Sequence, residues 1–440
     1  MSISIRAPRL PRARLWHIIA IAFFMNFLSQ LDRGNLGFAF PYMQKALNMD
    51  ATIAGLAGSI FFIGYFLLQI PSGKLAEKWS AKRIVIVAAI LWGLIVMCTG
   101  LVQNAGQLLT LRFVLGLAES AQVPALVILL ARWFSSRERG RAMALFALST
   151  PVSSAVASIL SGWIIGATGH WQAMFYIEGA LPFIGVILVG VFMKDRPADA
   201  TWLSTQEREY LEDGLAADRA AAIPKPATLL SALKSRVIIQ LVVIYFLLQF
   251  GQYGFSLWLP TIVGDLTHGN AYEVGAITAL PWIAAAIGLI VTGSHSDRNG
   301  DRKFHIGITV TIGAIFLLIS TLIGASAVVL SMIALIIAVG FFQGYLGVFY
   351  ALVPQAVAPA AVGVVMGLVN SVGTLGGGFA GPFVIGALND ATGNTTVGEM
   401  VLVGVLLVGA VLTMFLPRVA GRVEQDLAPQ AVRTKVGDGS

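Results

Sequence analysis

Twelve apolar runs, each long enough to cross a lipid bilayer as a helix, occupy most of this 440-residue chain. A membrane-spanning helix needs about 20 mostly apolar residues. Hydrophobic residues make up 57% of the sequence and charged residues only 12%, whereas soluble domains carry about 25% charged residues. The sequence therefore predicts an all-α membrane protein with twelve transmembrane helices in two pseudo-symmetric six-helix bundles. We expect the spans at residues 16–37, 51–72, 84–102, 106–131, 141–166, 173–193, 236–260, 273–293, 305–324, 328–352, 361–387 and 398–417.

A single long polar stretch separates the first six runs from the last six. It covers residues 194–235 and contains Pro197, Pro224 and Pro226. We expect an N-terminal bundle over residues 1–193, a cytoplasmic linker over 194–235, and a C-terminal bundle with a short cytoplasmic tail over 236–440. Within the linker, the four residues 204–207 read Ser-Thr-Gln-Glu, a capping-box pattern that predicts a short surface helix.

An eleven-residue pattern occurs twice, at residues 73–83 and 293–303. Both copies read glycine, three residues, an acid, a base, three residues and two bases. Each copy lies between two apolar runs at a matching place in its half, which indicates a duplicated bundle of the kind found in carriers. The pattern residues are Gly73, Glu77, Lys78 and Arg83 in the first copy and Gly293, Asp297, Arg298 and Arg302 in the second.

The net charge of +7 indicates membrane topology rather than binding to nucleic acid. If the spans alternate in direction, the basic clusters all fall on one side, and the turns near 103–105 and 167–172 on the other side carry almost no Lys or Arg. By the positive-inside rule we expect both termini to be cytoplasmic. The clusters are Arg6, Arg9, Arg12 and Arg14, then Lys82 and Arg83, then Arg132, Arg137, Arg139 and Arg141.

Residue types that would support a metal site or covalent catalysis are sparse and scattered. Cys98 is the only cysteine, so no cysteine-based metal site can form. No nucleophile and base are paired in a way that suggests hydrolysis. We therefore expect no catalytic residues, no metal and no cofactor, and a protein that is not an enzyme. The histidines are His17, His170, His268, His295 and His305.

Four charged residues lie inside apolar spans, where charges are costly and usually face a cavity or each other. Asp32 and Arg33 lie in the first span, and Arg112 and Glu119 in the fourth. A separation of seven residues places Arg112 and Glu119 on nearly one helix face, about 10 Å apart along the axis. The planar fork of arginine suits a carboxylate, so two arginines favour an anionic substrate. In the structural alternative, the four residues only pair with one another and hold the two helices together.

Other polar residues in the spans are uncharged, and they either bind substrate hydroxyls or form hydrogen bonds between helices. The sequence leaves both interpretations open. A dense glycine cluster, residues 373–381 followed by Pro382, favours close helix packing over a nucleotide-binding loop. The uncharged polar residues are Tyr65 and Gln69 in the second span, Gln249, Gln252, Tyr253 and Ser256 in the seventh, Gln343, Tyr345 and Tyr350 in the tenth, and Asn370 in the eleventh.

The repeated eleven-residue pattern resembles the loop motif of the major facilitator superfamily, and the resemblance covers nearly the whole chain. In that family the motif's acid and bases form a cytoplasmic latch that holds the outward-facing state, and this resemblance implies the same role for both copies here. Glu77 occupies the place that usually holds Asp in the first copy.

Further motifs are similar to those of the anion:cation symporter branch, which includes carriers for sugar acids, tartrate, phthalate and glutamate. They are Leu31-Asp32-Arg33-Gly34-Asn35, Arg112 with Glu119, Trp133-Phe134 followed by residues 137–141, and Ile177-Glu178-Gly179. The resemblance implies a small organic anion, protons and the lipid bilayer as partners. It also implies a bacterial inner membrane protein that functions as a monomer.

Residue roles carried over from galactonate-type carriers of that branch complete the predicted site. The resemblance makes Arg33 and Arg112 the anion-handling cations and Asp32 and Glu119 the proton-linked acids. Tyr65 and Asn370 match positions that line the binding cavity, and we add Gln252 and Tyr253 as substrate-binding candidates. This sequence has Thr150 where those carriers place a glutamine, and Ala351 where they place a tryptophan.

The leading hypothesis is a secondary active transporter that imports an organic carboxylate by proton symport with alternating access. The substrate would be a sugar acid, a dicarboxylate or an aromatic acid. The alternative is a proton-antiport exporter of drugs or metabolites. Exporters of this superfamily commonly carry a Gly-Pro-rich motif in helix five, whereas residues 149–154 here read Ser-Thr-Pro-Val-Ser-Ser. A nutrient receptor would be expected to carry a long cytoplasmic signalling domain, and we see none in the sequence.

Overall fold

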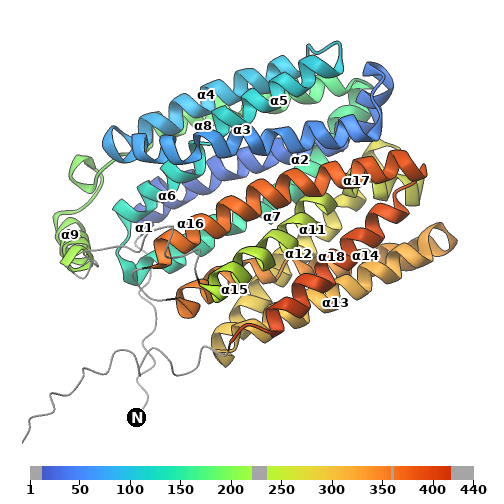
Figure 1. The fold of residues 1–440 in the computed structure, drawn as a ribbon. Helices are drawn as coiled ribbons and strands as arrows, with labels where there is room; N and C mark the ends of the chain where they lie inside the picture. The colour runs from blue at the N-terminus through green and yellow to red at the C-terminus, as the bar shows by residue number, and fades with distance from the viewer. Residues whose placement is uncertain (1–11, 221–234, 358–360, 418–440) are drawn as a thin grey trace, which may run out of the picture.

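Long helices lying side by side form the molecule, with the N-terminal half along one side and the C-terminal half along the other (Figure 1). The computed structural model describes residues 12–220, 235–357 and 361–417, and every regular element in these ranges is helical. The basic residues Arg6 and Arg9, the prolines Pro224 and Pro226 and the expected tail from residue 418 lie outside the described residues.

Six spans form each half. In the N-terminal half, the first span combines α1, the π-helical η1 and α2, and the fourth combines α5 and α6. The linker contributes η2 and α9. The N-terminal and linker elements are α1 Arg12–Arg14, η1 Leu15–Ala20, α2 Ile21–Leu47, α3 Ala51–Lys78, α4 Ala81–Thr99, α5 Ala105–Glu119, α6 Gln122–Trp133, α7 Ser136–Thr168, α8 Trp171–Phe192, η2 Pro197–Asp199 and α9 Thr205–Ala220.

The C-terminal half also has two interrupted spans, and the interruption in the fourth span of each half is the one that the halves share. Its tenth span combines α14 and α15, and its eleventh combines α16, the π-helical η5 and α17. The elements are α11 Arg236–Thr267, α12 Ala271–Asn299, α13 Arg302–Ile323, η3 Gly324–Ala327, α14 Val328–Phe342, α15 Tyr345–Ala356, α16 Val362–Val372, η5 Gly373–Gly377, α17 Gly378–Thr392 and α18 Thr396–Met414.

The prediction of twelve transmembrane helices is confirmed for the described residues. By length and hydropathy, 11 helical stretches can cross a membrane, and one of these, Arg302–Ala356, is 55 residues long. That stretch is two spans, because the chain reverses at Gly324, where φ is +50°. Ser320 of α13 then donates a 2.9 Å hydrogen bond to the carbonyl of Ser331 in α14. The spans also carry apolar side chains on their outer faces, among them Leu67, Ile187 and Ile290, as a lipid environment requires.

Several helices extend well past the apolar runs that predicted them. The first span was expected at residues 16–37 but continues to Leu47, and the fifth was expected at 141–166 but covers Ser136–Thr168. Hydropathy locates the part of a helix inside the bilayer, whereas backbone hydrogen bonding continues through polar residues until a cap ends it. Here the left-handed residues Asn48 and Gly169 provide those ends.

The glycine cluster packs its helix tightly against α11, which confirms the packing interpretation. A Cβ atom at Gly377 would lie 2.6 Å from the backbone nitrogen of Phe250, and one at Gly381 would lie 2.5 Å from the Phe250 carbonyl oxygen. Real Cβ atoms do not approach backbone this closely, so only glycine fits at these two positions. The π-helical turn at Gly373–Gly377 is the local irregularity that such a glycine run permits.

The predicted linker helix is present as α9. The Ser204 hydroxyl accepts a 3.2 Å hydrogen bond from the Glu207 amide and donates one of 3.3 Å to the Glu207 carboxylate. Ser204 therefore caps the helix as expected. The Glu207 carboxylate contacts the Ser204 hydroxyl, whereas in a capping box it would bond to the backbone amide of the serine. The Asp218 carboxylate of α9 accepts hydrogen bonds from the Ser136 amide and hydroxyl, at 2.7 and 2.6 Å, which joins α9 to the start of α7.

The two ends of the bundle differ in charge. We call the end that contains residues 73–83, 132–141 and 293–303 the motif end, and the end that contains the turns at 48–50, 169–170, 268–270 and 393–395 the far end. Both described chain ends and α9 lie at the motif end (Figure 1). The pattern and linker residues make this end strongly basic, whereas Lys45 is the one Lys or Arg in the far-end residues 45–53, 97–107, 165–173, 264–274, 321–330 and 389–398.

The two halves are packed together at the far end. A Cβ atom at Gly55 of α3 would lie 2.5 Å from the Pro382 carbonyl oxygen of α17, and one at Gly275 of α12 would lie 2.6 Å from the Ser158 carbonyl oxygen of α7. The Asp390 carboxylate also accepts hydrogen bonds from the amides of Ala51, at 2.8 Å, and Thr52, at 2.6 Å. Among the described residues, no side-chain hydrogen bond or ion pair joins the two halves at the motif end.

The repeated pattern lies where α3 meets α4 and where α12 meets α13. In the second copy, Arg302 and Asp297 form a 2.9 Å ion pair. In the first copy, Arg132 of α6 donates to the Glu77 carbonyl at 3.1 Å, and the carboxylate of Asp195 accepts from the Lys82 amide at 3.0 Å. The Glu77 carboxylate has no ion pair within the described part of the chain. The latch role of both copies stays a prediction.

Candidate functional site

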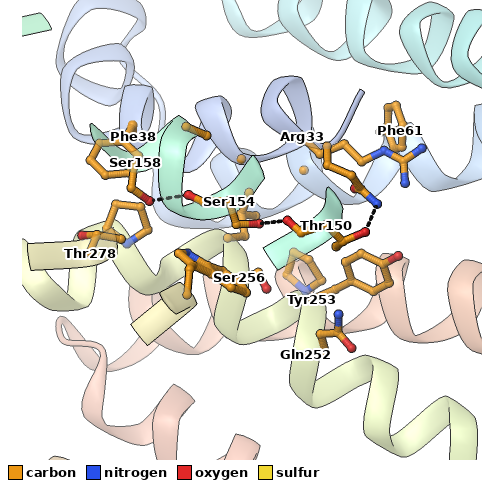
Figure 2. A pocket seen from close by; sticks show the side chains of 18 of the residues that line it. Arg33, Phe38, Phe61, Thr150, Ser154, Ser158, Gln252, Tyr253, Ser256 and Thr278 are labelled. Carbon is orange, nitrogen blue, oxygen red and sulfur yellow. Dashed lines mark hydrogen bonds between the residues drawn. The ribbon is translucent and has the colours of Figure 1, made fainter. Parts of the chain in front are cut away.

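A central cavity lies between the two halves, and side chains from both halves line it (Figure 2). Helices α2, α3, α5 and α7 contribute from the N-terminal half, and α11, α12 and α17 from the C-terminal half. Two arginines and a set of uncharged hydrogen-bonding groups face this space. The polar residues that line the cavity are Gln30, Arg33, Arg112, Thr150, Ser154, Ser158, Gln252, Tyr253, Ser256 and Thr278.

The four charges predicted within the spans form one buried cluster beside the cavity. Asp32, Arg112 and Glu119 are each less than 5% exposed. The Arg33 guanidinium donates through Nε to Glu119 Oε2 at 3.1 Å, and the Ser29 hydroxyl donates to the same oxygen at 3.0 Å. This ion pair joins α2 to α5, and both interpretations of the cluster, substrate handling and helix pairing, stay predictions.

Pairing within the cluster leaves several polar atoms without partners. Asp32 Oδ1 accepts a 3.0 Å hydrogen bond from Asn35, and Asp32 also interacts electrostatically with Glu119 and Arg112. Within the described residues, Asp32 Oδ2, Glu119 Oε1 and Arg33 Nη2 are buried with no hydrogen-bond partner. Buried polar groups are normally satisfied, so these three atoms are exceptions among the described residues.

Aromatic rings hold the two arginines in place. The Arg33 guanidinium lies 4.8 Å from the ring centre of Tyr65 and 5.1 Å from that of Phe61, and the Arg112 guanidinium lies 5.2 Å from the Phe61 centre. Such cation–π contacts stabilise a buried cation without neutralising it. Arg112 also donates a 3.4 Å hydrogen bond to the Ala57 carbonyl. Tyr65 therefore contacts Arg33 and is not among the residues that line the cavity.

The polar residues of the C-terminal half divide into a cavity-facing group and an internal network. Gln252 and Tyr253 line the cavity, and their role in substrate binding stays a prediction. Tyr345 donates to the Gln252 side-chain oxygen at 2.9 Å. Asn370 does not line the cavity, because its oxygen accepts a 3.1 Å hydrogen bond from Tyr350. The role of Asn370 in substrate binding stays a prediction.

A row of hydroxyls on α7 lines the cavity, and of its three members the sequence analysis had identified only Thr150 as a site position. Thr150, Ser154 and Ser158 follow one another at helical spacing along the cavity (Figure 2). Ser158 donates to the Ser154 carbonyl at 2.8 Å, Ser154 to the Thr150 carbonyl at 3.2 Å, and Gln30 of α2 donates to the Thr150 hydroxyl at 3.2 Å. Their i, i+4, i+8 spacing places them on one helix face, and the sequence could have predicted the row from that spacing.

Phe61 and Ser29 were also missed, although spacing on their helices offered a signal. Phe61 lies four residues before Tyr65 on α3, and Ser29 lies four residues before Arg33 on α2. Residues four apart share one helix face, so both positions were recoverable once Tyr65 and Arg33 had been selected. No group of three or more metal-ligating side chains occurs in the described ranges.

The comparisons with known proteins agree on the family. The Major Facilitator Superfamily profile matches residues 22–381 and 267–436. The chain is 32% identical over 435 residues to a putative tartrate transporter of Agrobacterium vitis, covering 98% of this chain and 94% of that protein. It is 31% identical over 408 residues to a quinolone resistance transporter of Acinetobacter baumannii, covering 91% of this chain and 93% of that protein.

A solved structure shows the same fold. The crystal structure of a D-xylose–proton symporter superposes with a TM-score of 0.76 at 14% identity, covering 93% of this chain and 99% of that one. The tartrate transporter match agrees with the resemblance to the organic-anion branch. With the family profile matched over most of its length, this chain belongs to the Major Facilitator Superfamily, and it is a transporter rather than an enzyme.

Proposed function

We propose that this protein imports a small organic carboxylate across the bacterial inner membrane by proton symport. The observation that carries the proposal is Arg112. It lines the cavity and is buried, yet it has no ion pair within the described residues. A buried cation without a paired anion is costly, and a substrate carboxylate in the cavity would provide the missing partner through two parallel hydrogen bonds.

Proton coupling follows from the pairing of Arg33 with Glu119. While Glu119 is ionised, its carboxylate holds Arg33 at 3.1 Å. Protonation removes the negative charge and releases Arg33 for a second contact with the substrate. Binding of a proton and of the anion are then mutually favourable. Asp32 is the alternative proton acceptor, because it interacts with both Glu119 and Arg112. The family resemblance supports both acids.

We infer the orientation in the membrane, and the side to which the cavity opens, from charge and packing. We place the strongly basic motif end in the cytoplasm by the positive-inside rule, which puts both termini there. Because the halves are packed at the far end and not joined by polar contacts at the motif end, this conformation is inward-facing. Both halves of the cavity come from one chain, so we take the monomer as the working unit.

A second candidate is an exporter that uses proton antiport, and the 31% identical quinolone resistance transporter favours it. The site argues against a cationic drug, since both charged groups that line the cavity are arginines. The two functions differ in the ligand that is transported and in the direction in which the proton gradient drives that ligand.

Two measurements on the purified protein test the proposal. A thermal-shift screen against aliphatic, aromatic and sugar carboxylates, with tartrate included, identifies the ligand, because binding to the folded state raises apparent stability. Reconstituted liposomes with an imposed inward proton gradient should then accumulate that carboxylate and should not do so without the gradient. Stabilisation only by cationic or neutral drugs would support the exporter instead. Accumulation that is indifferent to the gradient would refute symport.

A further inference from the structure

Two of the histidines that are scattered in the sequence lie against each other at the motif end. His295 is near the C-terminal end of α12, and His305 is in the first turn of α13. Gly300, with φ +69°, ends α12 in the left-handed conformation, which glycine adopts without strain. The chain reverses there, and the two imidazole ring centres come within 5.0 Å of each other.

One nitrogen of each ring points at the other ring. His295 Nδ1 lies 2.7 Å from His305 Nε2, and the second nitrogen of His305, Nδ1, contacts the carbonyl oxygen of Asp301. A carbonyl oxygen only accepts hydrogen bonds, so His305 Nδ1 carries a hydrogen. In the neutral ring, His305 Nε2 then carries a lone pair and accepts a hydrogen bond from His295 Nδ1. The two rings therefore share one hydrogen between two nitrogen atoms that can each bind a metal ion.

The partners of the outer ring nitrogens are those that metal-binding histidines use. Such histidines almost always donate their second ring N–H to a carbonyl, a carboxylate or water, which fixes the ring, and His305 already makes this contact with Asp301. The amide of Asn299 lies 3.5 Å from each ring nitrogen of His295. If that amide turns end for end, its oxygen can accept a hydrogen bond from His295 Nε2.

Most of the basic residues in this copy of the pattern are held by other partners. Arg302 pairs with Asp297 at 2.9 Å, and Lys303 donates to two backbone carbonyls at the end of the last span, at 2.8 and 3.3 Å. Arg298 remains, and its charge opposes a cation without occupying either ring nitrogen. The contact between the two rings is exposed, so a metal ion can reach it from water.

We propose that His295 and His305 form a two-histidine site for a divalent transition metal ion. Imidazole suits Zn²⁺, Cu²⁺ and Ni²⁺, whereas Mg²⁺ and Ca²⁺ take oxygen ligands. With metal–nitrogen bonds of about 2.0–2.1 Å, two nitrogens on one ion lie about 3 Å apart, so the rings need to separate by about 0.3 Å. The ion replaces the shared hydrogen, which moves to His295 Nε2, and water completes the coordination. The metal ion then cross-links α12 to α13 across the second copy of the pattern.

Isothermal titration of the detergent-purified full chain, prepared without a polyhistidine tag, tests the site without any substrate. The wild type should bind one Zn²⁺ ion per chain, should bind Cu²⁺ more tightly, and should not bind Mg²⁺. His295→Ala and His305→Ala should each lose this binding. His295→Cys should restore Zn²⁺ binding, because a cysteine thiolate is a zinc ligand.

A matched control and a spectroscopic measurement separate the paired site from binding to any surface histidine. His170 is also exposed, but it lies at the far end, so His170→Ala should bind Zn²⁺ as the wild type does. Electron paramagnetic resonance of bound Cu²⁺ should show two imidazole nitrogens in the wild type and at most one in either alanine variant of the pair. Each of these two variants tests the site separately, so the test stays valid if one of them does not fold.

Two results would overturn the proposal. One is a wild-type protein that shows no saturable binding of Zn²⁺ or Cu²⁺. The other is metal binding of unchanged affinity in both His295→Ala and His305→Ala, which would place the ion elsewhere. Neither result depends on transport, and the site uses none of the residues proposed to bind the substrate or the proton. If liposomes show no symport while Zn²⁺ binds to the wild type and not to these variants, the proposed function fails and the metal site stands.

Discussion

Replacing Arg112 is the most direct test of the anion site. Arg112→Ala removes a guanidinium that we expect to give two hydrogen bonds to the substrate carboxylate. Hydrogen bonds to charged groups contribute about 1.5–3 kcal/mol each. Taking the lower figure for each of two bonds, the alanine variant loses about 3 kcal/mol, which weakens binding roughly 100-fold. Arg112→Lys keeps the charge but not the planar fork, so it should lose about one hydrogen bond and bind roughly tenfold more weakly.

The assay is isothermal titration of the purified variants with the carboxylate that most stabilises the wild type. Arg14→Lys is a matched control, because Arg14 is a fully buried arginine that pairs with Glu138 at 2.8 Å and does not line the cavity. It should change stability and leave the dissociation constant unchanged. Equal affinity of Arg112→Lys and the wild type would refute a forked contact. Equal affinity of Arg112→Ala and the wild type would refute a role for Arg112 in anion binding.

Further predictions concern coupling and topology. Glu119→Gln, a permanently neutral mimic, should still exchange substrate across liposome membranes but should not accumulate it under a proton gradient. If Asp32→Asn loses accumulation while Glu119→Gln keeps it, the coupling proton belongs to Asp32, and if both keep it, symport is wrong. In a Cys98→Ala background, a cysteine at position 137 should resist an impermeant thiol reagent added outside, whereas one at position 268 should react, and the reverse labelling would invert the topology.

The sequence predicted the spans well because bilayer crossing imposes a length and a hydropathy that each run must meet. It predicted the charged cluster for a related reason: Asp32, Arg33, Arg112 and Glu119 are so costly in apolar spans that they had to face a cavity or one another. In the structure they lie together, with two of them on the cavity wall. Their roles in binding and coupling stay predictions.

The sequence could not predict details that depend on how helices rotate against their neighbours. Tyr65 and Asn370 are polar residues on the expected helices, yet Tyr65 contacts Arg33, Asn370 bonds to Tyr350, and neither lines the cavity. The hydroxyls of Thr150, Ser154 and Ser158 form the α7 wall, but serine and threonine are common in membrane helices and bond back to their own backbone. Tertiary packing alone decides which of these groups faces the substrate.

The contact that Asp390 makes across the far end is weak, because it joins a carboxylate to a helix terminus. Its carboxylate binds the free amides of Ala51 and Thr52, which are the first residues of α3, so a helix terminus in one half serves as the receptor for an acid in the other. Contacts between an anion and a helix terminus are worth about 0.3–2 kcal/mol. That corresponds to a population ratio of roughly 2 to 30. A carrier must open and close this contact in every cycle, and a contact of this strength can hold the two halves together at the far end yet be broken by the binding energy of a single small ligand.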